Sequence, residues 1–157
     1  MSPLRGKSRN TIVNKTVTYC DGLSGSCLLI RREALEKAGL IPEKYFLFFE
    51  EMEWCLNIRN QGYKLAVIYT ADVYHKGSAT LKKTGINSKY YLARNQVLFV
   101  RRNGTTFDLC LFLLTKGLCY LYRRIFSISS RREIRKMEFE AFWEGLTMNK
   151  NAQETTK

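Results

Sequence analysis

The residues best suited to chemistry are three carboxylates at the edge of an aromatic run. Residues 45–49 read YFLFF, and Glu50, Glu51 and Glu53 follow directly. A carboxylate beside an apolar wall is desolvated, which raises its pKa and makes it a better general base. The same acids also suit a helix N-terminus, where each would stabilise the helix by about 0.3–1 kcal/mol. Taken alone, the acid cluster is compatible with both interpretations.

Two further groups could bind a ligand. His75 is the only histidine and ends an apolar run. Its imidazole could bind a divalent metal beside a carboxylate and phosphates, although a lone histidine at a strand end is more often structural. Ser24, Gly25 and Ser26 are small enough to let a ligand approach the backbone closely, or they form a simple turn.

A fourth group lies in the stretch YYLARN. Tyr90, Tyr91, Arg94 and Asn95 fall close together on a predicted helix. Aromatic rings beside an arginine could stack on bases or bind phosphates. They could equally form a packing face from which the arginine reaches solvent.

Composition indicates a folded, basic domain. The chain has 157 residues, of which 45% are apolar and 13% aromatic, and this argues against disorder. The net charge is +12, and +9 of it lies from Lys82 onward. A C-terminal half with this excess of positive charge favours an anionic partner, namely nucleic acid, anionic lipid or a phosphorylated substrate. We see no RNA-recognition motif, zinc knuckle or helix-turn-helix signature, which disfavours nucleic acid.

The cysteines indicate neither a disulfide framework nor a zinc site. Five are present, an odd number, and no pair has CxxC spacing. They lie within apolar segments, which fits a reducing compartment. The first ten residues are basic but no apolar run follows them, so they do not form a secretory signal.

Apolar runs and turn residues predict an α/β chain. The predicted strands are 17–20, 27–30 and one or two within 64–75. The predicted helices are 32–38, 50–60 and 88–103, each followed closely by a glycine. On the second helix, Met52, Cys55, Leu56 and Arg59 share one side. Residues 78–85 are predicted to form a loop.

The order of these features resembles the C-terminal half of family 2 glycosyltransferases, most closely the rhamnosyltransferase-like bacterial members that build surface polysaccharides. The resemblance rests on a collinear series over about residues 17–103. The series comprises SGSCLLIRREAL, the acid cluster, a helix ending in Gly-Tyr, a strand, His-x-Gly-Ser and YYLARN. It implies part of a GT-A-type domain, the nucleotide-diphospho-sugar transferase fold, with mixed sheet strands, flanking helices and a helical C-terminal region.

The resemblance also implies roles for residues. Glu51 matches the base that takes the acceptor's proton, and Glu50 matches the acid before it. Glu51 and Glu53 stand where the family usually has aspartate, so both side chains are one methylene longer. His75 matches a histidine that completes a Mn²⁺ or Mg²⁺ site. The residues implied in substrate binding are Ser24, Gly25, Ser26, Trp54, Arg59, Arg94 and Asn95, with Arg59 orienting the acids.

The family's donor-binding features are not found in this sequence. It contains no Asp-x-Asp motif and no glycine-rich phosphate loop. We therefore expect residues 16–104 to be the acceptor and catalytic-base half of a larger enzyme. The donor half would come from an N-terminal part or another subunit, and this chain alone would be inactive. The expected partners are a nucleotide-sugar donor and a glycan or lipid-linked acceptor.

The remaining segments are a basic arm over 1–15, a helical region over 105–148 and a disordered tail over 149–157. The apolar part of residues 107–126 spans only about 16 residues and contains Asp108 and Lys116, which disfavours a membrane span. Arginine pairs follow, so a helical pair could cover the catalytic domain or lie on the inner, cytoplasmic membrane face. An ordinary helix buried against Phe139, Phe142 and Trp143 is the simpler alternative. The alternative function is a non-catalytic basic module that binds anionic lipid or RNA.

Overall fold

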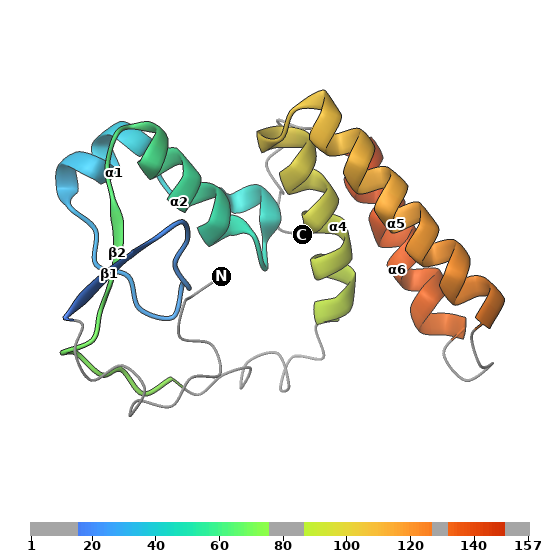
Figure 1. The fold of residues 1–157 in the computed structure, drawn as a ribbon, viewed down its shortest axis with the longest axis horizontal. Helices are drawn as coiled ribbons and strands as arrows, with labels where there is room; N and C mark the ends of the chain where they lie inside the picture. The colour runs from blue at the N-terminus through green and yellow to red at the C-terminus, as the bar shows by residue number, and fades with distance from the viewer. Residues whose placement is uncertain (1–15, 76–86, 127–131, 150–157) are drawn as a thin grey trace. The chain divides into compact units, whose positions relative to one another are not determined.

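The computed structural model describes residues 16–75, 87–126 and 132–149. The described chain is mixed α/β, mostly helical with a small two-stranded sheet (Figure 1). It forms two compact units. Unit 1 contains the described residues up to 43 and from 50 to 75, and unit 2 contains 44–49 and those from 87 onward. The predicted arm over 1–15, the loop over 78–85 and the tail from 150 lie outside the described residues.

Unit 1 contains two helices and an antiparallel pair of strands. Strands β1 (Val17–Cys20) and β2 (Leu65–Ile68) are antiparallel. Helices α1 (Arg32–Ala38) and α2 (Glu50–Asn60) follow the predicted bounds. Gly39 and Gly62 adopt φ of 79° and 83° just beyond these helices, where glycine ends a helix at little steric cost. The core centres on Cys55, Ile58 and Leu65.

One detail of the prediction for unit 1 is wrong. Residues 27–30 form no strand, and the Leu29 side chain is 98% exposed. A strand needs a partner for its backbone groups, and in the described structure β1 and β2 pair only with each other. Residues 64–75 hold one strand, β2, which agrees with the one or two strands predicted there. The buried side of α2 includes Ile58, whereas Arg59 is exposed.

Unit 2 consists of three helices and the segment 44–49, which includes the end of a 3₁₀ turn, η2 (Glu43–Tyr45). The helices are α4 (Ser88–Asn103), α5 (Thr106–Phe126) and α6 (Arg132–Thr147). Helix α4 packs most extensively on α6. A side chain on Gly145 of α6 would overlap the Arg94 carbonyl, so glycine lets the two backbones approach closely.

Helix α5 begins with a reciprocal cap. The Thr105 amide and hydroxyl donate to the Asp108 carboxylate at 2.9 and 2.7 Å, and the Asp108 amide donates to the Thr105 hydroxyl at 3.1 Å. These bonds lower the pKa of Asp108. Asp108 therefore has a structural role at the start of the apolar segment.

Helix α5 is not buried along its whole length, so the interpretation of an ordinary buried helix is wrong for one of its sides. Leu114 and Leu118 are 61% and 58% exposed, and Phe139 and Trp143 of α6 are exposed as well. Within the described ranges, no helix is both long enough and apolar enough to cross a bilayer.

Candidate functional site

The acid cluster forms the first turn of α2. Glu50 and Glu51 are half-buried, whereas Glu53 is only 2% exposed. One carboxylate oxygen of Glu50 and one of Glu51 are buried and accept no hydrogen bond within the described structure. An unpaired buried oxygen is costly, so such atoms often mark a site that binds a donor from a ligand.

The pKa of Glu50 is raised from its ordinary 4.5 to about 7. Burial is the main cause, because it disfavours the charged form, and the neighbouring Glu51 carboxylate raises the pKa further. A hydrogen bond from the backbone opposes both effects. A carboxyl group that titrates near neutrality can both accept and release a proton at working pH.

The loop after β1 lies against the acid-bearing side of α2. A Cβ atom on Gly25 would stand 3.8 Å from the Cβ of Glu51, so the loop backbone and this acid are in contact distance. Ser24 and Ser26 are exposed and their hydroxyls are 3.0 Å apart. The structure therefore brings the small-residue motif and Glu51 together, although 25 residues separate Gly25 from Glu51 in the sequence.

Two contacts hold this loop on α2. The Leu23 amide donates to the Cys55 sulfur at 3.4 Å, and burial raises the pKa of that thiol. Arg59 forms an ion pair with Asp21 at 2.9 Å and donates to its carbonyl at 3.4 Å. Arg59 lies eight residues beyond Glu51, about 12 Å along the helix, so it contacts the loop's start and not the acids.

Trp54 also makes a structural contact. Its indole N–H donates to the Gly39 carbonyl at 2.8 Å, and this links α2 to the end of α1. The substrate-binding roles of Trp54 and Arg59 stay predictions, and the contacts observed here are within unit 1.

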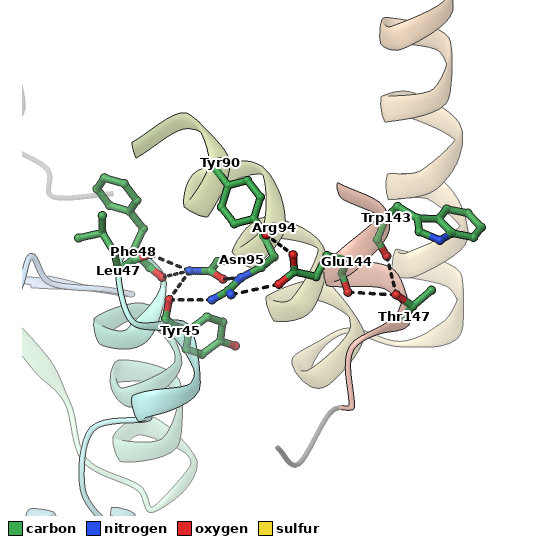
Figure 2. Close-up of polar contacts among 9 residues, drawn as sticks. All are labelled: Tyr45, Leu47, Phe48, Tyr90, Arg94, Asn95, Trp143, Glu144 and Thr147. Carbon is green, nitrogen blue, oxygen red and sulfur yellow. Dashed lines mark hydrogen bonds and ion pairs between the residues drawn. The ribbon is translucent and has the colours of Figure 1, made fainter. Parts of the chain in front are cut away.

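In unit 2, Arg94 and Asn95 hold the aromatic segment 45–48 (Figure 2). Asn95 is fully buried, and its amide nitrogen lies 2.7, 2.6 and 3.2 Å from the carbonyl oxygens of Tyr45, Leu47 and Phe48. The Arg94 guanidinium donates to the Tyr45 carbonyl at 3.3 Å and to the Asn95 side chain at 2.9 Å. The donors implied for substrate binding thus serve the chain's own backbone.

The segment they hold has an unusual backbone. Phe46, Phe48 and Phe49 adopt φ of 58°, 65° and 73°, the left-handed region that bulky residues avoid at a cost of about 1–2 kcal/mol each. Aromatic contacts with α4 support this conformation. The ring centroids of Phe46 and Tyr91 are 5.0 Å apart, and those of Phe49 and Phe99 are 5.5 Å apart. Glu50 is the next residue in the sequence.

An acid of α6 completes the unit 2 network. Glu144 pairs with Arg94 at 3.3 Å and accepts a hydrogen bond from the Tyr90 hydroxyl. Burial, together with this bond, raises the pKa of Tyr90 to about 12. The sequence patterns did not single out Glu144, Tyr45 or Asp21 as partners of these residues. Glu144 is one of four glutamates in α6, so its type and position gave no distinct signal, and a backbone carbonyl such as that of Tyr45 leaves none.

The described residues do not fit a metal centre by themselves. His75 is exposed at the end of a described segment, and no three His, Cys, Asp or Glu side chains of the described ranges gather as metal ligands would. A Mn²⁺ or Mg²⁺ site that includes His75 would need donors from outside the described residues.

Comparison with known proteins identifies sugar transferases. The chain is 30% identical over 83 residues to the dTDP-rhamnosyl transferase RfbF of Shigella flexneri, a match covering 48% of this chain and 28% of the relative. It is 27% identical over 70 residues to the low-salt glycan biosynthesis hexosyltransferase Agl10 of Haloferax volcanii, covering 45% and 22%. It is 36% identical over 59 residues to an N-acetylglucosaminyl-diphospho-decaprenol L-rhamnosyltransferase of Mycobacterium tuberculosis, covering 37% and 19%.

These matches cover between 19% and 28% of the relatives' lengths. No profile of a known protein family matches the chain, and no solved structure matches it. The chain is therefore a distant relative of rhamnosyl- and hexosyltransferases that act in glycan synthesis.

Proposed function

We propose that this chain is the acceptor and catalytic-base part of an inverting glycosyltransferase with a GT-A-type domain. The observation that carries the proposal is the Glu50–Glu51 pair, which lies beside Gly25 and presents two buried carboxylate oxygens with no hydrogen-bond donor. An acceptor hydroxyl could supply such a donor. The relatives named above support the reaction class.

The proposed reaction follows from this pair. The acceptor oxygen bonds to the anomeric carbon of the donor sugar while the bond from that carbon to the donor diphosphate breaks. The hydroxyl proton passes to Glu51, and the nucleoside diphosphate leaves with the negative charge. Glu50, whose pKa burial raises to about 7, shares the site and can itself hold or release a proton near neutral pH. Glu53 is too buried to meet a substrate directly.

In this proposal Arg94 and Asn95 have a structural role. They hold the strained aromatic segment of unit 2, so their donors bond to the chain's own backbone and do not act as ligands of the sugar. The donor nucleotide, and any metal bound to its diphosphate, would be held by a part of the enzyme that this chain does not supply.

A chimera tests the proposal. The matched segment of RfbF is replaced by the corresponding segment of this chain, and rhamnosyl transfer from the dTDP-sugar is followed with a radiolabelled donor. We expect Glu51→Gln to reduce turnover by about 10²–10⁴-fold without weakening donor binding, because general base catalysis contributes that factor. The matched control is Glu43→Gln, an exposed acid outside the site.

Two results would count against the proposal. One is a folded, active chimera in which Glu51→Gln keeps more than about a third of the rate. The other is rhamnosyl or hexosyl transfer by this chain alone above a control without enzyme, which would show that no separate donor part is needed.

A further inference from the structure

The outward side of α5 is an apolar stripe. Its five residues follow one another at spacings of four, three, four and four, which places them on one helix face. They are Phe107, Leu111, Leu114, Leu118 and Tyr122, exposed by 74%, 49%, 61%, 58% and 63%. The stripe extends about 22 Å along the helix. Contiguous apolar patches of more than a few hundred Å² usually mark an interaction surface.

The charged residue in the middle of α5 lies on the opposite side. Lys116 is partly buried, its ammonium group is 5.6 Å from the centre of the Phe112 ring, and it lines a pocket with Lys89 of α4 and Glu138 of α6. A surface helix in water normally shows the reverse pattern, with apolar residues inward and charges outward. The pattern of α5 therefore fits an apolar medium on its outer side.

The charge of the residues near the stripe indicates what kind of partner covers it. Residues 123–136 contain six lysines and arginines and one acid, Glu133, and the whole chain carries +12. A second copy of the chain would bring the same positive charge, whereas an anionic bilayer attracts it by about 1 kcal/mol per basic residue near the surface. Phe107 and Tyr122 at the ends of the stripe are aromatic, and tyrosine is enriched where a bilayer meets water.

We propose that the α5 stripe docks on the surface of an anionic lipid bilayer, with the helix lying in the plane of the interface. Such a helix buries its apolar face about 5–10 Å deep while basic residues meet the lipid phosphates. The inference rests on contacts within unit 2 and not on sugar transfer. A lipid-linked acceptor would be met at the same surface.

Co-sedimentation with vesicles tests the proposal on the full chain. Vesicles of phosphatidylglycerol mixed with phosphatidylcholine are compared with vesicles of phosphatidylcholine alone, at low and high salt. The variant Leu114→Gln/Leu118→Gln is compared with Leu29→Gln/Leu40→Gln, whose leucines are 98% and 78% exposed but lie outside the stripe. Circular dichroism verifies that both variants keep their helices.

We expect the wild type to bind the phosphatidylglycerol vesicles at low salt and to be released as salt rises. The stripe variant should lose at least about tenfold in partitioning, because two leucines no longer enter the interface, and the control variant should bind like the wild type. Absence of binding at low salt, equal binding to both vesicle types, or equal losses in both variants would overturn the proposal. Self-association that the stripe variant abolishes, without vesicle binding, would identify a second copy as the occupant and also overturn it.

Discussion

The contact that most directly supports the unusual backbone of residues 45–49 is the Asn95 amide. Replacing Asn95 with alanine removes the donor that faces the carbonyl oxygens of Tyr45, Leu47 and Phe48. Alanine keeps α4 helical, since it is the better helix former. The variant therefore tests the hydrogen bonds from Asn95 and not the stability of the helix.

The expected cost of Asn95→Ala follows from these contacts. An amide nitrogen has two hydrogens, so the three close carbonyls share two hydrogen bonds. The Tyr45 carbonyl keeps its hydrogen bond from Arg94, so the variant leaves the largely buried carbonyls of Leu47 and Phe48 unpaired, at about 1–3 kcal/mol each. The gain in helix propensity returns about 0.5 kcal/mol. We expect Asn95→Ala to lower the free energy of unfolding of unit 2 by about 2–5 kcal/mol, a large part of the stability of a typical domain.

Asn103→Ala is the matched control, because Asn103 ends the same helix and donates to the Phe99 carbonyl at 3.1 Å in a less buried place. It should cost less than about 1 kcal/mol. Urea unfolding is followed by circular dichroism and by Trp143 fluorescence in a Trp54→Phe background, which reports on unit 2. If the two variants unfold at the same urea concentration, the three carbonyl contacts do not stabilise this segment and the reasoning fails.

Three further predictions concern single side chains. In the folded state Glu50 holds a proton that the unfolded state loses between pH 4.5 and about 7, so its burial destabilises the protein as pH rises through that window. Glu50→Gln should remove this pH dependence and raise the free energy of unfolding by about 1–2 kcal/mol at pH 8, after allowance for partial exposure. An unchanged pH profile of urea unfolding would contradict this prediction. Gly145→Ala should lower the free energy of unfolding by at least about 2 kcal/mol, because the new Cβ overlaps the backbone of α4. The control Gly117→Ala, with open space around it, should raise that free energy by about 0.5–1 kcal/mol, and equal effects of the two variants would rule out the close helix approach. The pKa of Tyr90 is raised to about 12, so the unfolded state ionises first and the free energy of unfolding should fall between pH 10 and 12. Tyr90→Phe should lose this alkaline fall in stability, and a fall retained in the variant would assign it to another group.

The periodicity of the sequence was sufficient to place most helices and both strands. Helices α1, α2 and α4 have the bounds that glycine stops and apolar spacing predict. Acids in the first turn of α2 interact with nearby backbone groups, so their place at a helix start can be predicted locally. The collinear motifs also predicted the reaction class of the relatives, because motif order survives where overall identity has fallen to about 30%.

Only the tertiary structure decided which groups meet. Residues 27–30 looked like a strand, but strand formation depends on a partner elsewhere in the chain, and none pairs with them in the described structure. Left-handed phenylalanines have no sequence signal, since bulky residues avoid that conformation unless distant contacts such as Asn95 support it. Likewise, apolar spacing shows that α5 has an apolar face, but whether that face packs inward depends on how α4 and α6 fold against it. Here the stripe faces outward, while Lys116 faces the neighbouring helices.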